Sequence, residues 1–196
     1  MRTETTITKI YTFDELSEEA KEKVIGELRE FEGEAWLKDL VSCMKSAADC
    51  MGISIKNYSI STDGSGYINF SVEDDDLEGI RAYKFIVNRL FSEVDKEKFY
   101  YKRWEKRRKS NLERKDWMDN CPFSGMCYDY AMKNAWVNWC SELRKGNSPS
   151  VRDFLNELEY QYLHEIANDY YGFDEENARD LADANGYEYL EDGTLY

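Results

Sequence analysis

The stretch Leu37-Lys38-Asp39-Leu40-Val41-Ser42-Cys43-Met44-Lys45-Ser46-Ala47-Ala48-Asp49-Cys50-Met51-Gly52 carries the clearest periodic pattern in this chain. Its apolar residues recur three and four positions apart, which is the spacing of one face of an α-helix. The stretch ends at a glycine, the residue that most readily adopts the left-handed conformation after a helix. We therefore expect a helix that begins after Gly33, stops at Gly52 and buries its apolar face.

Two β-rich runs follow that helix, at 53–61 and 67–72. The five residues between them include Gly64 and Gly66, which tolerate positive φ and favour a tight connection. Apolar residues alternate with polar ones in the second run, so the core face of that strand should carry Ile68, Phe70 and Val72. The pattern predicts an antiparallel hairpin.

Further elements are expected on both sides of this centre. Upstream, a short strand is expected over 5–11, and Thr12 with Glu15 has the spacing of a capping box that opens a helix towards an inward-facing Phe31. Downstream, helices are expected over 77–94 with Ile80, Tyr83, Val87, Leu90 and Val94 inward, over 132–143, from the N-cap Ser148 through 166, and over 174–184, before a tight hairpin about Asp192-Gly193. The order of elements predicts an α+β fold, predominantly helical with a small antiparallel β-sheet, in a single domain over 1–196.

The composition is that of a folded protein. The 196 residues are 42% hydrophobic and 15% aromatic, which disordered chains are not. The first six residues lack the apolar region of a signal peptide, and no apolar run approaches the length of a membrane span. We expect a cytosolic protein without a membrane partner, whose five cysteines are reduced.

Charge is distributed unevenly along the chain. Residues 96–115 hold ten Lys or Arg against three Glu, net +7, so the remainder of this −14 chain sums to −21. From Asp153 to the end there are 13 acidic residues and one basic residue, Arg179. We expect a basic helical segment at about 96–118 and an acidic C-terminal unit at about 150–196. Such asymmetry governs association more than it governs the fold.

Motifs for catalysis and metal binding fail on inspection. The only histidine, His164, is followed by Asn168 where a zincin helix requires its second ligand, and Cys121 and Cys127 are too far apart for a zinc ribbon. The acidic run 74–79 resembles half of an EF-hand loop, but Phe85 stands where the bidentate Glu is needed. We expect no catalytic residues, no metal and no cofactor, and hence no enzyme.

Two interpretations remain for the acidic C-terminal unit. Carboxylates held in rows on a rigid scaffold can imitate a phosphate backbone and occupy a basic channel, whereas a charge-rich face can also serve solubility alone. For the first interpretation, the candidate partner-binding residues are Asp174, Glu175, Glu176, Asp180 and Asp183.

The basic segment likewise allows two interpretations. Aromatic residues alternate with cations in it, as in nucleic-acid-binding proteins, where phosphates supply affinity and rings stack on bases. The candidate residues for nucleic-acid binding are Arg103, Trp104, Arg107 and Arg108. Alternatively, the segment neutralises the acidic remainder of its own fold.

The two ends of the chain, 11–21 and 188–196, resemble small acidic accessory proteins encoded by bacteriophages and prophages. The resemblance implies no catalytic or binding residue. It implies a protein made in the bacterial cytoplasm that inhibits an anti-phage defence in the manner of anti-CRISPR proteins. The expected partner is a bacterial defence protein or ribonucleoprotein complex, bound stoichiometrically.

Overall fold

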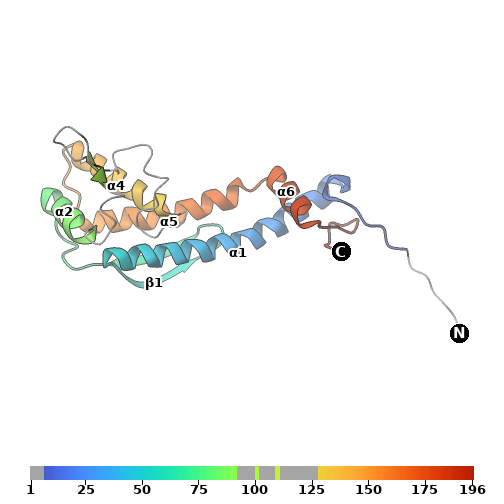
Figure 1. Ribbon diagram of the computed structural model, residues 1–196, viewed down its shortest axis with the longest axis horizontal. Coiled ribbons are helices and arrows are strands. Elements are labelled where there is room, and N and C mark those ends of the chain that lie inside the picture. Colours follow the sequence, from blue (N-terminus) through green and yellow to red (C-terminus); the bar gives the residue numbers. More distant parts are fainter. Residues whose placement is uncertain (1–6, 92–99, 102–108, 111–127) are drawn as a thin grey trace. The chain divides into compact units, whose positions relative to one another are not determined.

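The structure is a computed structural model that describes residues 7–91, 100–101, 109–110 and 128–196. The chain is predominantly helical with a small antiparallel β-sheet, as the sequence predicts. Its contacts define two compact units: unit 1 comprises Met1–Ala35 with Asn168–Tyr196, and unit 2 comprises Trp36–Ala167. The two long helices of Figure 1, α1 and α5, contribute residues to both units.

Helix α1 is one continuous helix over Glu18–Met51 and contains both Gly26 and Gly33. The expected break near Gly33 is therefore wrong. A glycine costs about 1 kcal/mol inside a helix, but most helical stability in proteins comes from tertiary packing. Here the residues before Gly33 pack in unit 1 and those after Ala35 pack in unit 2. Phe31, expected to face inward, is 62% exposed.

The hairpin follows the expected pattern. Strands β1 (Ser54–Ile60) and β2 (Gly66–Ser71) pair antiparallel, with a bulge between Ile55 and Asn57. Ile68 and Phe70 are buried in the core of unit 2, while Val72 is half-buried against it. The side chains predicted for the core face of the second strand are thus confirmed there.

The helix expected over 77–94 is shorter, and only part of its expected inward face is buried. Helix α2 spans Gly79–Phe85 and continues as one π-helical turn, η2, over Ile86–Leu90. Leu90 is buried and Val87 is half-buried against the core, as expected, whereas Ile80 is 61% exposed and Tyr83 is also exposed, so the inward placement of these two is wrong. Ala82 and Ile86 are buried in their place, and Val94 lies outside the described residues. The backbone N–H of Gly79 donates to the Pro149 carbonyl at 2.9 Å, a long-range contact that helps orient the start of the helix and that no local pattern reveals.

Helices α4 (Asp129–Arg144) and α5 (Val151–Gly172) supply the aromatic part of the unit 2 core. The Trp136 and Trp139 rings stack with centroids 5.5 Å apart, and Phe154 meets Trp136 edge-on at 6.2 Å. The inward face predicted for α5 is confirmed by its buried residues Val151, Leu155, Leu158, Tyr162 and Ile166.

The start of α5 differs from the prediction. Ser150, and not Ser148, caps the helix: its N–H donates to Asp153 Oδ2 at 2.7 Å, and the Asp153 N–H donates to Ser150 Oγ at 3.1 Å. This reciprocal pair satisfies two donors at the helix terminus. Pro149 therefore lies before the cap and not at the first helical position.

Unit 1 is assembled from both ends of the chain. The Thr12–Glu15 capping box forms, but it closes a 3-10 turn, η1 (Phe13–Glu15), and α1 starts only at Glu18. Helix α6 spans Glu175–Asn185, close to the helix expected over 174–184. The described part of the expected strand 5–11 forms a single bridge, from Tyr11 to Tyr189, and Tyr189 also bridges Leu195 across the C-terminal turn.

The C-terminal residues do not form a unit by themselves. The sequence suggests one domain with an acidic unit at about 150–196, but residues 168–196 pack with the first 35 residues, and the start of α5 belongs to unit 2. Most of the acidic segment therefore packs with residues from the N-terminal end of the chain to form unit 1.

Little of the basic segment 96–118 falls within the described residues. The backbones of β3 (Tyr100–Tyr101) and β4 (Lys109–Ser110) pair antiparallel, in place of the helix expected at these four positions. The candidate nucleic-acid-binding residues Arg103, Trp104, Arg107 and Arg108 lie outside the described residues, as do Cys121 and Cys127. Across the described ranges, no helix has an apolar stretch of the length that a bilayer requires.

Candidate functional site

The division into units separates the charge of the chain almost completely. Unit 1 contains 19 acidic and 6 basic residues, net −13, whereas unit 2 contains 21 acidic and 20 basic residues, net −1. Unit 2 reaches near-neutrality because it includes the basic segment. Nearly all of the net charge of −14 therefore belongs to unit 1, and the candidate site is the acidic surface of its helix α6.

Helix α6 is held firmly at both termini. The Asp174 side chain accepts a hydrogen bond from the Asn177 N–H at 3.1 Å, and the Asn177 side chain accepts one from the Asp174 N–H at 3.0 Å. Gly186 ends the helix with a φ of 64°, the left-handed conformation that glycine adopts without strain. Ala178 and Ala182 are buried, which defines the inner face of the helix.

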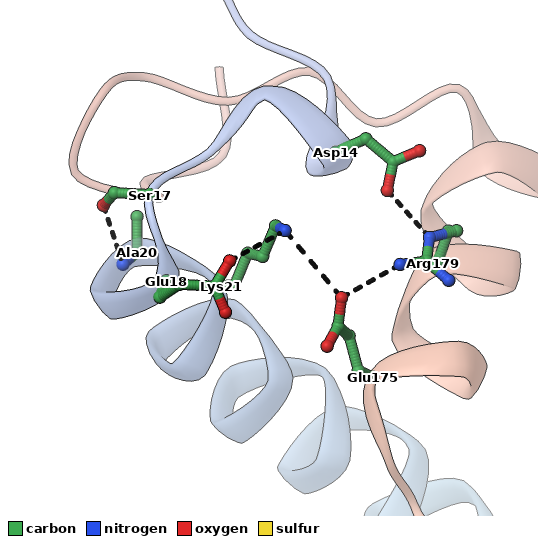
Figure 2. Close-up of polar contacts among 7 residues, drawn as sticks. All are labelled: Asp14, Ser17, Glu18, Ala20, Lys21, Glu175 and Arg179. Carbon is green, nitrogen blue, oxygen red and sulfur yellow. Dashed lines mark hydrogen bonds and ion pairs between the residues drawn. The ribbon is translucent and has the colours of Figure 1, made fainter.

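An alternating row of charges joins α6 to the N-terminal part of unit 1 (Figure 2). Arg179 Nε donates to Asp14 Oδ1 at 2.7 Å, and Arg179 Nη2 donates to Glu175 Oε1 at 2.9 Å. Lys21 Nζ lies 3.8 Å from Glu175 Oε1 and 3.1 Å from Glu18 Oε1. The hydrogen bond to Asp14 is the main reason that the pKa of Arg179 is raised. We call this row of charges the latch.

The five predicted binding residues fall into two groups, according to whether their carboxylates have partners within the fold. All five are exposed. Asp174 caps the helix and Glu175 belongs to the latch, so both already have partners. The carboxylates of Glu176, Asp180 and Asp183 form no hydrogen bond or ion pair within the part of the chain that the structure describes, although Asp180 is close enough to Arg179 to contribute to its raised pKa.

The three unpaired carboxylates share one face of α6. Their separations of four and three residues place them on one side of a helix, opposite the buried Ala178 and Ala182. With a rise of 1.5 Å per residue, they span about 10 Å along the axis. We call Glu176, Asp180 and Asp183 the acidic stripe.

Helix stability does not account for the acidic stripe. Like charges four residues apart destabilise a helix by a few tenths of a kcal/mol. Carboxylates near a helix C-terminus also oppose the helix dipole, and Asp183 lies in the last turn, where α6 has no basic residue. Glu176 alone, in the first turn, is favourably placed.

The latch is the part of the site that sequence reasoning missed. Arg179 stands out as the lone basic residue of the C-terminal segment, but its partner Asp14 is 165 positions away. No local pattern links residues so distant. The sequence did contain a signal for the three unpaired carboxylates. Glu176, Asp180 and Asp183 are spaced four and three residues apart, which places them on one helix face that does not include Asp174.

Other chemistry-bearing groups have structural roles. The Cys43 thiol lies 3.6 Å from Asp129 Oδ1 in the core of unit 2, next to Tyr162, whose pKa is raised chiefly by burial. Asp75, from the run that resembles half of an EF-hand, pairs with Arg152. His164 stacks on Tyr160 along one flank of α5, with ring centroids 5.5 Å apart. Among the described side chains, no group of three or more His, Cys, Asp or Glu is arranged to hold a metal ion.

Comparison with known proteins places the chain in no family. No protein-family model matches it, and neither a curated protein nor a solved structure does. The geometry and charge of unit 1 therefore carry the functional argument.

Proposed function

We propose that this protein is a stoichiometric inhibitor whose acidic stripe occupies a basic, nucleic-acid-binding groove of its partner. It acts by binding and not by catalysis. The observation that carries the proposal is the acidic stripe: three exposed, unpaired carboxylates on the outer face of a well-capped helix, in the unit that carries −13 of the net charge of −14.

The stripe suits a groove built for phosphates. A helix displays its carboxylates at fixed spacing, so little conformational entropy is lost when they bind. The surrounding excess of negative charge attracts a basic partner over distances of about a Debye length, roughly 8 Å at physiological salt. Because the latch uses Asp14, Glu175 and Arg179 internally, the stripe remains available.

The biological setting follows from the resemblance of both chain ends to small acidic phage and prophage proteins. In that setting the partner is a bacterial defence protein or ribonucleoprotein complex, met in the host cytoplasm, and the protein acts in the manner of an anti-CRISPR inhibitor. This part of the proposal rests on the resemblance, whereas the binding mode rests on the geometry of α6.

The direct test is competition with nucleic acid. Purified bacterial defence effectors would be titrated with the protein in the presence of labelled target DNA, and displacement at a one-to-one ratio is expected for the true partner. Reversal of the stripe, Glu176→Lys with Asp180→Lys and Asp183→Lys, should abolish displacement. The matched control reverses three exposed carboxylates of unit 2, Asp39, Asp49 and Asp76, for the same change in net charge.

The two triple variants separate a shaped surface from bulk charge. Equal loss in both variants would mean that net charge alone drives binding, and unchanged displacement by the stripe variant would exclude the stripe. Rising salt should weaken the wild-type complex, because exposed charges are screened.

One substitution should change partner binding and the stability of the fold in opposite directions. Asp183→Lys removes an acidic residue from the last turn of α6 and places a cation near the negative end of the helix dipole, so it should stabilise the fold by about 0.5 kcal/mol. The same change should weaken partner binding. Thermal unfolding and the displacement assay measure the two effects, and a variant that loses both stability and binding would show that Asp183 supports the fold.

A second candidate function belongs to unit 2, which contains 20 of the 26 basic residues. In this alternative, Arg103, Trp104, Arg107 and Arg108 bind nucleic acid directly. A gel shift that weakens steeply with salt and disappears on replacement of the three arginines by alanine would support it. Absence of any shift at low salt would exclude it.

A further inference from the structure

One edge of the hairpin in unit 2 is covered by side chains of α5. On the outer edge of β2, the Ile68 N–H donates to Glu159 Oε1 at 2.9 Å, and the Phe70 carbonyl accepts from Arg152 Nη1 at 3.0 Å. At the tip, Gly64 lies so close to α5 that an added Cβ would be 2.7 Å from the Ala167 Cβ. Strand β2 therefore cannot extend the sheet.

Within the described ranges, the opposite edge of the hairpin, along β1, is open. Ser61 donates to the Ser65 carbonyl at 2.8 Å, and alternation along an antiparallel ladder then directs the N–H and C=O groups of Ser59 towards β2 and those of Tyr58 and Ile60 away from it. The outward Ile68 N–H, opposite Tyr58, fits the same alternation.

No described residue bonds to the outward backbone groups of β1, and every residue of the strand is exposed or half-exposed. A strand edge of this kind is a template for pairing with another chain. Strand β1 is labelled in Figure 1.

Two charges stand along this edge. Lys56 is the extra residue of the bulge and the only charged residue of β1, and Asp63 lies in the turn at the other end of the strand. Asp63 accepts hydrogen bonds from the N–H and hydroxyl of Ser65, which lower the pKa of its carboxyl and keep it ionised. The edge therefore presents a cation at one end and an anion at the other.

We propose that β1 pairs antiparallel with β1 of a second copy of this chain, about a two-fold axis at Ser59. In this register Tyr58 lies opposite Ile60 of the second copy, and Ile60 lies opposite its Tyr58, so both outward residues exchange backbone hydrogen bonds. The two hairpins become one four-stranded sheet, β2-β1-β1-β2. The inference is independent of the proposed inhibitory function.

The charges along this edge favour a second copy of the chain as the source of the partner strand. A Lys at a bulge usually deters edge pairing, because a partner strand brings no compensating charge. In the register centred on Ser59, however, the end of β1 that carries Lys56 runs beside the turn of the second copy that carries Asp63. The two-fold axis repeats this arrangement, so each end of the paired strands brings a cation near an anion. The pairing also removes the last open edge of the hairpin.

The first test measures mass. The full-length protein should sediment at about twice the 23.2 kDa of the chain, with a concentration-dependent transition to monomer. Tyr58→Pro removes an outward N–H without removing a bond to β2 and should raise the dimer dissociation constant at least tenfold. Tyr58→Ala loses the same ring but keeps the N–H and should remain dimeric. A protein that is monomeric at all concentrations overturns the proposal.

The second test fixes the register and does not depend on the proline variant. Ser59→Cys places two thiols across the axis, at a pair whose Cα atoms lie about 4.5 Å apart, within the range for a disulfide. Mild oxidation should yield a covalent dimer. In Asn57→Cys the two new thiols are four residues apart along the strands and should not join.

The outcomes of the cross-linking test are decisive. Wild-type protein gives the background from the five natural cysteines. Equal cross-linking of the two variants, or a dimer that Tyr58→Pro leaves intact, overturns the β1 interface. So does a monomer whose open edge captures an extended segment of a different protein.

Discussion

The two units differ in how they are held together. Among the described residues, unit 2 has 27 buried apolar side chains that form one cluster, rich in aromatic rings, and its charges nearly cancel. Unit 1 has eight buried apolar side chains, a net charge of −13, and a set of caps, a tight turn and the latch. The charged surface therefore lies on the unit with fewer buried apolar side chains.

The largest effect should come from the core of unit 2. Phe154 is fully buried and meets both Trp136 and Phe91 edge-on, so Phe154→Ala leaves a cavity among rings that cannot close it. We expect a loss of about 3–5 kcal/mol in the free energy of unfolding. Chemical denaturation measures it. Tyr160→Ala, on the exposed side of the same helix, should cost much less, and equal losses would contradict the importance of the aromatic cluster.

A smaller loss is expected from the C-terminal turn of unit 1. Gly193 has a φ of 78°, and a Cβ there would lie 2.8 Å from the Ala20 carbonyl oxygen, on α1. Gly193→Ala should cost about 2 kcal/mol through backbone strain and this clash. Amide hydrogen exchange should show the loss in unit 1 and leave the most protected amides of unit 2 unchanged.

Gly186 provides the matched control. Its φ of 64° imposes a similar strain on alanine, but no atom lies within 4 Å of the added Cβ. Gly186→Ala should therefore cost about 1 kcal/mol, and the difference between the variants isolates the contact with α1. If the two losses were equal, the turn would not be packed tightly against α1.

The next effect concerns the cap of α6. Asp174→Ala removes the acceptor for the Asn177 N–H and should cost about 1 kcal/mol. Asp174→Ser keeps an acceptor and should retain most of the stability. Thermal unfolding compares the two, and partner displacement should persist in both, because the stripe does not include Asp174. Loss of displacement in the serine variant would show that Asp174 also belongs to the binding surface.

The smallest effect is the pH dependence of the C-terminal turn. Hydrogen bonds from the N–H and hydroxyl of Thr194 lower the pKa of Asp192 below its ordinary 3.8. A folded-state pKa below the unfolded one stabilises the fold above pH 3.8, and that contribution is lost as the pH falls through the folded pKa. An NMR titration should place the Asp192 midpoint below 3.8, and Thr194→Val should raise it only in part, because the backbone donor remains. A midpoint at or above 3.8 would contradict the turn geometry.

Periodicity predicted much of the fold. The apolar spacing over 37–51, the alternation through Ile68 and Phe70, and the inward face of α5 all correspond to buried residues. The errors have two causes. Gly33 and Ile80 suggested an end and a face that long-range contacts overrode, because the packing of each half of α1 and the bond from Gly79 to Pro149 are absent from any sequence window. The N-cap at Ser148 was wrong for a local reason, since Ser150 and Asp153, three residues apart, form the reciprocal pair that caps α5.

The candidate site was predictable only in outline. The sequence places five carboxylates on one helix, and their spacing already separates three of them. It does not reveal the latch, because Asp14, Glu18 and Lys21 come from one end of the chain and Glu175 and Arg179 from the other. The candidate basic residues 103–108 lie outside the described residues and stay a prediction.

Sequence patterns alone predict the fold class, the hairpin, the helix that carries the acidic stripe, and the excess of negative charge. These follow from short-range rules of periodicity, capping and composition. Tertiary contacts are needed to show that nearly all of the net charge belongs to one unit, that two of the five carboxylates are engaged, and that β1 keeps an open edge among the described residues. Those features depend on contacts between residues far apart in the chain, whose free energy no local pattern encodes.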